Sequence, residues 1–250
     1  FLSVNTYGEG SLKAGMAKVD ITPSIPVQLY GYASRKDLSK GVHDQLYARI
    51  VVFENSGNKL LLISSDLGSY DEDLFEEIKT KLMGKFSLKE SEIIISTIHS
   101  HSSPVVALKS DWLHENNLKY TKELIGKLIA GTGDAFAAMK PVTTGLGTGS
   151  SPIGTNRREM RPDGAIKLGR NPCGPADKEV QVMKIAAADG SFSGAVFDYA
   201  THATSLGYDN YIISGDVLGI AEQFVEKILG KGTVSPAFAG ASGDIDPWYR

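Results

Sequence analysis

The sequence predicts an α/β fold of the mixed α+β kind, with a mixed β-sheet core flanked by helices. Two observations predict it: short apolar runs of strand length recur along the 250 residues, and amphipathic helical segments lie between some of them. No apolar run approaches the ~20 residues that a membrane-spanning helix needs. The contents of 42% hydrophobic and 22% charged residues are ordinary for a globular chain.

Seven segments have the apolar patterning and the turn boundaries of strands. They are 48–55, 58–66, 91–98, 143–150, 179–189, 194–201 and 234–241. The first two flank Ser56-Gly57, and the segments 179–189 and 194–201 flank the short stretch Gly-Ser-Phe-Ser. Each of these two pairs therefore predicts a β-hairpin.

Three segments repeat apolar residues at helical spacing. The first has Ser69 or Asp71 as its N-cap and carries one apolar face, made of Leu74, Phe75, Ile78 and Leu82. The second, over 121–139, has Leu124, Ile125, Leu128 and Ile129. The third, over 215–232, has Leu218, Ala221, Phe224 and Ile228, followed by the stop signal Gly230.

The segment 151–178 is polar and rich in Gly and Pro, and we expect a long functional or disordered loop there. The net charge of −3 gives no electrostatic case for nucleic acid or for an anionic membrane surface. The single cysteine, Cys173, excludes an internal disulfide. Residues 1–10 show neither a signal-peptide pattern nor an initiator Met, so we expect a mature chain or an engineered fragment.

Groups that bind metals or transfer protons follow four of the predicted strands. These groups are Asp66, the pair His99 and His101, His202, and the pair Asp244 and Asp246. Because sites in α/β sheets gather at the carboxyl ends of strands, this placement predicts a shared site. Two histidines and a carboxylate suit zinc, with a water in the open position. We expect Ser100, Ser102 and Thr204 to hydrogen-bond the ligands.

Each of these features also has a simpler interpretation. A His-x-His pair fits polar residues in a turn, and the stretch 241–247 fits a turn capped by Asp. Asp20 fits a turn before Pro23, and His43 and His114 fit the surface or the surroundings of a site. Arg157 fits a solvated loop, or a group that binds a carboxylate or an oxyanion.

Several metal-dependent and hydrolytic folds do not fit the pattern. No Asp follows the His-x-His pair at the spacing of metallo-β-lactamase-like hydrolases, and the strands and helices alternate too irregularly for an eightfold barrel. No Gly-x-Ser-x-Gly elbow is present, and the glycine-rich stretches match no nucleotide fingerprint.

Taken in order, the segments resemble the N-terminal catalytic domain of the neutral/alkaline (non-lysosomal) ceramidase family. The matching stretches are AGMAKVDITP (14–23), GYASR (31–35), GVHDQLYARIVVFE (41–54), SSDLG (64–68), STIHSHSSP (96–104), GTNRR (154–158), DYATHATSLG (198–207), ISGDVLGIAE (213–222) and GASGDIDP (240–247).

This resemblance implies a zinc-dependent amidase that cleaves an amide bond of an N-acyl lipid or a related substrate. In the family, the positions matching His99 and His202 bind zinc. The position matching His101 lies beside the metal and the reacting amide, and the position matching Arg157 lines the active site. Family members act in sphingolipid metabolism and are mostly exported or membrane-associated. A bacterial origin, a secreted or periplasmic location and peripheral membrane contact are therefore expected.

The sequence departs from the family at Asp246, where ceramidases proper carry a catalytic Ser. An Asp there, together with Asp244, predicts water as the nucleophile, with the carboxylate positioning it or taking its proton. A metal-dependent esterase or phosphoesterase, or a non-catalytic lipid- or glycan-binding relative, is an alternative. The remaining family ligands, a Glu and a Tyr, are expected beyond Arg250. Residues 1–250 are thus expected to be one ceramidase-like catalytic domain that is truncated at its C-terminal end.

Overall fold

The computed structural model describes residues 12–249. Its main sheet has eight strands in the order β12-β10-β9-β6-β1-β3-β4-β5. The strands are β1 (Lys13–Asp20), β3 (Tyr47–Asn55), β4 (Asn58–Ser65), β5 (Ile93–Thr97), β6 (Lys140–Ser150), β9 (Glu179–Ala187), β10 (Phe192–Tyr199) and β12 (Ala237–Phe238). The pairs β4–β5 and β10–β12 are parallel and the others are antiparallel, which confirms the predicted mixed sheet.

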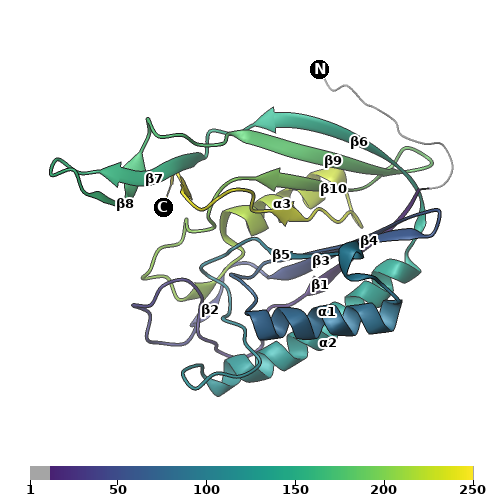
Figure 1. Ribbon diagram of the computed structural model, residues 1–250, viewed down its shortest axis with the longest axis horizontal. Coiled ribbons are helices and arrows are strands. Elements are labelled where there is room, and N and C mark those ends of the chain that lie inside the picture. Colours follow the sequence, from purple (N-terminus) through teal and green to yellow (C-terminus); the bar gives the residue numbers. More distant parts are fainter. Residues whose placement is uncertain (1–11, 250) are drawn as a thin grey trace.

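The sheet folds over into two layers (Figure 1). The fold lies between β1 and β6, which pair only at Lys13 and Ala14. Strands β6, β9 and β10 form the upper layer, and β1, β3, β4 and β5 form the lower layer. The Ser64 hydroxyl of β4 donates to the Ala237 carbonyl of β12 at 2.6 Å, so the two ends of the strand order come together. The segments that follow β5 and β10 pair at a parallel bridge between Ser100 and Ala203, so the carboxyl ends of these two strands meet.

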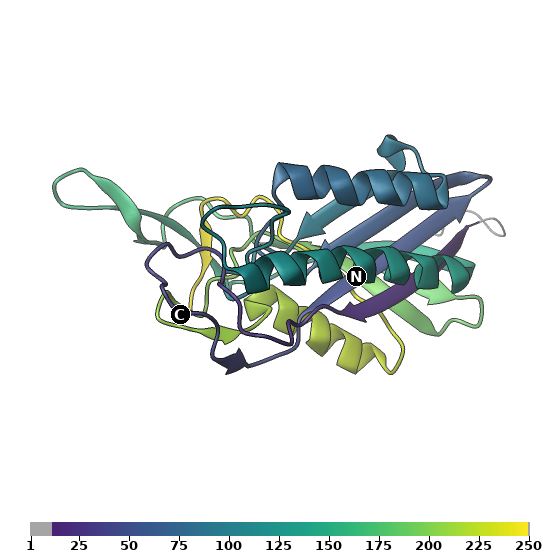
Figure 2. The ribbon, with the colours of Figure 1, turned by 90° about the horizontal axis from the view of Figure 1, so that it is seen from below.

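Helices α1 (Glu72–Phe86) and α2 (Glu115–Ala137) cover the outer face of the lower layer (Figure 2). Asp71 is the N-cap of α1, and its carboxylate accepts a bond of 2.9 Å from the Leu74 amide. The predicted apolar face of α1 is confirmed for its leucines and isoleucine, while Phe75 is half-buried.

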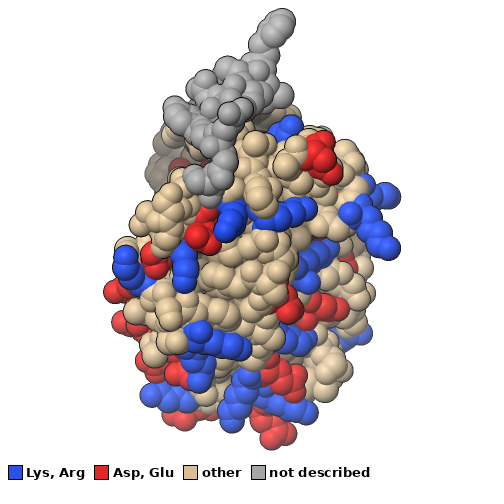
Figure 3. All heavy atoms as spheres, turned by 90° about the vertical axis from the view of Figure 1, so that its right-hand side faces the viewer, with Lys and Arg blue, Asp and Glu red and all other residues tan. Residues whose placement is uncertain are grey.

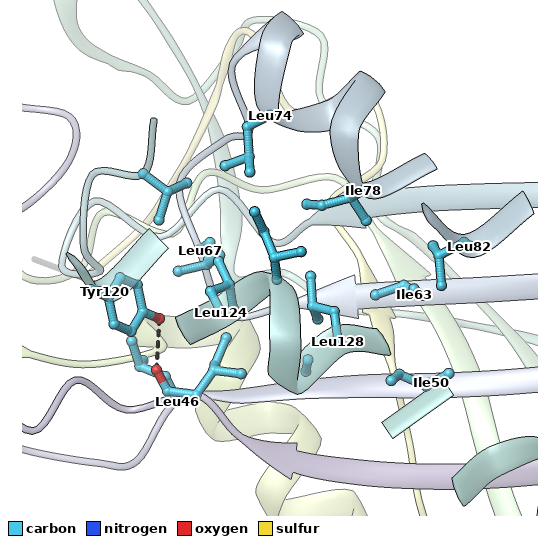
Figure 4. Packing of buried hydrophobic residues seen from close by; sticks show 14 of the residues in the cluster. Leu46, Ile50, Ile63, Leu67, Leu74, Ile78, Leu82, Tyr120, Leu124 and Leu128 are labelled. Atoms are coloured by element: carbon cyan, nitrogen blue, oxygen red, sulfur yellow. Dashed lines mark hydrogen bonds between the residues drawn. The ribbon is translucent and has the colours of Figure 1, made fainter. Parts of the chain in front are cut away.

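The apolar side chains of both helices interlock with those of the lower sheet layer (Figure 4). Leu82 and Ile78 of α1 and Leu128 of α2 lie over Ile63 and Ile50 of the sheet, and all five are fully buried. Burying side chains of this size stabilises a fold by about 1.5–3 kcal/mol each. This packing anchors both helices on the lower layer.

Both predicted hairpins are present. β3 and β4 pair along their full lengths through Ser56 and Gly57, which have φ values of 51° and 84°. Positive φ at both central residues is typical of a type I′ turn, whose twist matches that of the strands. β9 and β10 form the second hairpin.

The prediction of one long loop over 151–178 is wrong, because two strands form there. Strands β7 (Gly154–Met160) and β8 (Ile166–Asn171) form a hairpin that projects from the body of the molecule (Figures 1 and 2). β13 (Ile245–Pro247) pairs with the base of β7 and completes a three-stranded sheet. β8 begins with the alternating residues Ile166, Lys167 and Leu168, but β7 is polar except for Met160 and shows no such pattern, so the sequence gives little sign of this hairpin.

Helix α3 (Asp216–Leu229) lies between the layers and is oriented differently from the prediction. Leu218 is buried, but Phe224 is 60% exposed and Ile228 is 67% exposed. The buried side of α3 instead carries Glu222 and Glu226, which bind cations of the lower layer. Ion pairing therefore decides which face of α3 points inward.

The centre of this ion cluster is the fully buried Arg49 of β3. Its guanidinium lies 2.6 Å from Glu222, 2.7 Å from Glu226 and 3.1 Å from Asp66. Lys18 of β1 lies 2.7 Å from Glu226. Burial, and then the charge of Asp66, raise the pKa of Glu222 well above its ordinary value.

Three short elements complete the described part of the chain, namely β2 (Gly41–Val42), β11 (Ile212–Ile213) and the 3₁₀ turn Glu90–Glu92. No helix of residues 12–249 is long and apolar enough to cross a membrane. Residues 1–10, for which a mature or engineered start was expected, lie outside the described residues. On the face opposite the projecting hairpin, basic and acidic side chains are intermingled (Figure 3).

Candidate functional site

His99 follows the carboxyl end of β5, two residues after its last residue Thr97. Its backbone has φ of 59°, in the left-handed region that few non-glycine residues adopt. This turn brings the imidazole Nδ1 to 2.8 Å from the Gly68 carbonyl of the chain after β4. A carbonyl can only accept, so Nδ1 carries the proton and the Nε2 lone pair is left for a ligand.

His202 follows β10 and is held in the same way. Its Nδ1 lies 2.7 Å from the Ser242 carbonyl, and its amide donates to the Ile245 carbonyl at 2.9 Å. The Nε2 lone pair is therefore again the free one. Burial lowers the pKa of His202 to about 4, so the ring is neutral over the physiological range.

His101 completes a cluster of three imidazoles. The nitrogen atoms of His99, His101 and His202 that could bind a metal all lie within 4.8 Å of one another. Both ring nitrogens of His101 are buried and have no hydrogen-bond partner among the described residues. Burial, with the nearby histidines and arginines, lowers the pKa of His101 to about 3, so this ring is also neutral.

Two tyrosines and a glycine enclose His101. The Tyr30 and Tyr32 rings meet it edge to face at centroid distances of 5.6 Å and 5.0 Å. Gly31 has φ of 93°, and a Cβ atom there would lie 2.2 Å from His101 Nδ1. Only glycine allows this approach of backbone to ring.

Arg157 and Asp246 lie together beside the cluster. The β7–β8 pairing shifts register between Asn156 and Arg158, which leaves Arg157 in a bulge. Bulges redirect side chains, and here the Arg157 guanidinium donates to Asp246 Oδ1 at 3.3 Å and to the Gly243 carbonyl at 2.7 Å. The Thr204 hydroxyl donates to the same Oδ1 at 3.2 Å.

Asp244 joins two segments of the site by hydrogen bonds. Its carboxylate accepts from the Asn156 amide group at 3.1 Å, and its carbonyl accepts from the Arg157 amide at 2.8 Å. These bonds fasten the segment before β13 to β7. Its part in positioning water stays a prediction.

Asp66 does not join the cluster, although it also follows a strand. Its carboxylate accepts from the Tyr47 amide at 2.8 Å and from Arg49 at 3.1 Å. The expectation that Ser100 and Ser102 would hydrogen-bond the ligands is wrong. Ser100 donates to the Ser214 carbonyl at 2.8 Å, and Ser102 accepts from Asn210 at 3.0 Å.

Thr204 binds Asp246 instead of a histidine, and carbonyl groups orient the histidines. The three remaining candidates have local roles. His43 is exposed and lies 2.8 Å from Asp44, and His114 caps α2 by accepting from the Asn116 amide at 3.1 Å. Asp20 accepts from the Thr22 amide at 2.8 Å, as in the expected turn.

Sequence reasoning missed Arg35, which ties three segments of the site together. Its guanidinium donates to the Tyr30 carbonyl at 3.0 Å, to the His101 carbonyl, and to the Gly207 carbonyl at 3.0 Å. Tyr30, Tyr32 and Arg35 fall in or beside the stretch GYASR, which carries part of the family resemblance. A loop sequence by itself gives no sign of such long-range carbonyl contacts.

Two pockets flank the cluster. One, of about 860 Å³, lies on the side of Tyr30 and Tyr32 and extends to Leu29, Val106 and Trp112. The other, of about 480 Å³, is lined by His99, His202 and polar groups of the strand ends. Both pockets are lined by apolar and by polar side chains, so a substrate that carries both kinds of group can approach the imidazoles from either side.

The arrangement fits a metal ion. Neutral imidazoles whose Nδ1 atoms are hydrogen-bonded present their Nε2 atoms as ligands, and buried nitrogens without partners are rare unless something binds them. His99 and His202 meet the first condition, and His101 meets the second. The fold and the cluster thus define a mixed αβ domain with a candidate metal centre at its strand ends.

The chain belongs to the neutral/alkaline non-lysosomal ceramidase family, whose N-terminal region matches residues 12–247. It is 26% identical to the neutral ceramidase of Drosophila melanogaster over 257 residues, covering 94% of this chain and 36% of that protein. It is 24% identical to the neutral ceramidase of Pseudomonas aeruginosa, covering 93% of this chain and 36% of that protein.

The solved structures agree on the fold. The crystal structure of neutral ceramidase from Pseudomonas aeruginosa superimposes with a TM-score of 0.81 at 20% identity, covering 96% of this chain and 40% of that one. A ceramidase complexed with C2 gives a TM-score of 0.79 at 22% identity, covering 95% and 39% of the two chains. The chain thus spans well under half the length of these relatives.

Proposed function

We propose that the protein is a zinc-dependent hydrolase that cleaves the amide bond of an N-acyl lipid. The observation that carries this proposal is the cluster of His99, His101 and His202 in a member of the ceramidase family. The relatives named neutral ceramidase, and the solved ceramidase complexed with C2, support an N-acyl lipid as substrate. A secreted or periplasmic location remains a proposal from the family.

His99 and His202 would hold the metal through Nε2, because their Nδ1 atoms are committed to carbonyls. Imidazole nitrogens are good zinc ligands. When bound, the metal supplies a Lewis acid that polarises the substrate carbonyl and makes water more acidic. The neutral His101 ring, whose nitrogens are free of other bonds in the described structure, can hydrogen-bond the substrate or complete the ligand set.

Asp246 would direct the water. Thr204 and Arg157 both donate to its Oδ1 atom, which fixes the carboxylate beside the histidines. The carboxylate takes a proton as the water oxygen adds to the carbonyl carbon. The C–N bond then breaks, and the amine leaves with a proton while the acyl group leaves as a carboxylic acid. Arg157 is placed to stabilise negative charge that develops on the substrate oxygen.

The test combines metal analysis with hydrolysis of a fluorogenic N-acyl substrate by the full chain. We expect bound zinc in the purified protein, loss of zinc in His99→Ala and His202→Ala, and hydrolysis that a chelator abolishes and added zinc restores. His43→Ala, at an exposed histidine, is the matched control and should behave like the parent. Zinc content that is unchanged in both cluster variants would overturn the metal assignment.

A panel of amide, ester and phosphoester substrates decides the reaction class. Asp246→Asn should lower kcat by about 10²–10⁴-fold, because an amide cannot accept the proton. Ligand binding without turnover in the zinc-loaded protein would favour a non-catalytic lipid-binding relative. Faster cleavage of an ester or phosphoester would change the substrate class and leave the metal centre in place.

A further inference from the structure

The hairpin β7–β8 exposes an apolar face. Met160 pairs directly with Ile166, and Arg158 pairs with Leu168. Residues that pair directly point to the same face of a sheet, so the three apolar side chains are neighbours. Met160 is 71% exposed, Ile166 is 59% exposed and Leu168 is 60% exposed. The hairpin carries these side chains away from the body of the protein (Figures 1 and 2).

Exposing such an apolar face to water is unfavourable in free energy. A two-stranded hairpin is marginally stable alone, and contiguous exposed apolar side chains usually mark a site of contact. The tip itself is well formed: the Arg161 amide donates to the Ala165 carbonyl at 2.9 Å, and Asp163 accepts from the Ala165 amide at 3.0 Å. The apolar face is therefore held in place with no covering element among the described residues.

Arg158 and Arg170 lie on this face, and other basic residues of the hairpin lie at its tip and on its opposite face. From 158 to 170 the chain carries four basic side chains and two acidic ones, namely Arg158, Arg161, Lys167 and Arg170 with Glu159 and Asp163. Glu159 accepts from the Arg170 amide at 3.2 Å and lies 3.7 Å from Arg161. The net charge of the hairpin is thus positive although that of the chain is −3. At the opposite end of the molecule the two signs are intermingled (Figure 3).

We propose that the β7–β8 hairpin docks the protein on an anionic lipid surface. Met160, Ile166 and Leu168 enter the headgroup region, and Arg158 and Arg170 on the same face contact lipid phosphates. This inference rests on the proposed function, since the substrate is a lipid. Arg157, which binds Asp246, lies three residues before Met160, about 10 Å along an extended strand. Docking would therefore bring the lipid surface near the histidine cluster.

The size of the face favours lipid over a protein partner. Stable protein interfaces bury about 800 Å² on each partner, with 20–30 residues a side. The exposed hairpin face offers only Arg158, Met160, Ile166, Leu168 and Arg170. A narrow projection with an apolar centre and a basic rim suits insertion between headgroups.

The test is flotation of the full chain with phosphatidylcholine vesicles that contain or lack phosphatidylglycerol. We expect binding to the anionic vesicles that weakens with salt. The triple variant M160S/I166S/L168S should bind at least about tenfold more weakly. Arg170→Glu, which changes a cation of the docking face and leaves its three apolar residues in place, should weaken binding about tenfold at low salt. The matched control I220S/F224S/I228S replaces three exposed apolar residues of α3 and should bind like the parent.

The proposal is overturned if the parent ignores anionic vesicles, if the triple variant binds them like the parent, or if the α3 variant alone loses binding. It is also overturned if the hairpin face mediates self-association, seen by light scattering as a dimer that the triple variant abolishes. Hydrolysis of a water-soluble N-acyl substrate is measured in parallel. Loss of that activity with vesicle binding retained would count against the proposed function and leave the docking inference standing.

Discussion

The imidazole rings of His99 and His202 meet edge to face, with their centroids 4.8 Å apart and their planes at 80°. Each ring is anchored by Nδ1 to a carbonyl from a different part of the chain, Gly68 for one and Ser242 for the other. The relative orientation of the rings is thus set by the backbone before any ligand binds. Groups fixed in this way lose little entropy when they bind a metal.

Gly31→Ala should damage the histidine cluster. A Cβ atom at Gly31 would overlap the His101 ring, at 2.2 Å from Nδ1, and the left-handed φ adds strain of about 1–2 kcal/mol. Gly57→Ala is the matched control, because Gly57 has a similar φ of 84° and open space around it. Both variants should lose stability in urea unfolding, but only Gly31→Ala should weaken cobalt or zinc binding. Equal metal affinity in the two variants would show that His101 is not held by this contact.

Arg49→Met should lower the free energy of unfolding by about 3–5 kcal/mol, because it leaves buried carboxylates without their cation. Lys40→Met breaks an exposed pair with Asp37 and should cost less than about 1 kcal/mol. Urea unfolding of both variants at neutral pH measures the difference. Similar costs in the two variants would mean that the buried cluster relaxes or admits water.

Glu222→Gln should flatten part of the pH dependence of stability. The pKa of Glu222 is raised in the folded protein, so the folded state keeps a proton that the unfolded chain releases above its ordinary pKa of about 4.5. The contribution of this group is full below that pH and is lost as pH rises towards the folded pKa. Glutamine mimics the protonated carboxyl, so the gap between variant and parent should shift in favour of the variant from pH 5 to pH 8. A constant gap, measured by unfolding at several pH values, would contradict a raised pKa of Glu222 in the folded protein.

Leu218→Ala and Phe224→Ala should differ sharply in cost although both residues belong to the apolar set of α3. Leu218 is 2% exposed and its truncation should cost about 2–5 kcal/mol. Phe224 is 60% exposed, and its truncation should change stability by about 0.5 kcal/mol or less. Thermal unfolding of the two variants measures this. A large cost at Phe224 would place that side chain in a contact made by another molecule in solution.

Local sequence patterns predicted the elements that depend mainly on residues close by in the sequence. The hairpin at Ser56-Gly57 and the apolar face of α1 follow from short-range rules and are confirmed, except that Phe75 is half-buried, and of the two predicted caps the structure has Asp71. The grouping of His99 with His202 followed from their positions after strands, because the fold brings the carboxyl ends of β5 and β10 together. Their roles as ligands stay predictions.

The other features of the fold and of the site depend on partners far away in the sequence, which local patterns do not reveal. The orientation of α3 depends on Arg49, which lies far away in the sequence, and no periodicity in α3 shows that its acidic side is the buried one. The carbonyls of Gly68 and Ser242 that orient the histidines carry no side-chain signal at all. The β7–β8 hairpin was missed because its glycines and prolines, read alone, are typical of a loop.

The two layers of the sheet are joined only by the short pairing of β1 with β6, and this affects how the protein folds. His99 belongs to the lower layer and His202 to the upper, so neither half of the chain can assemble the cluster by itself. Contacts between segments this distant in sequence form slowly, after local hairpins and helices. Metal affinity should therefore be among the last properties that a refolding chain regains. The rate at which metal binding returns would then measure the rate at which the two layers come together.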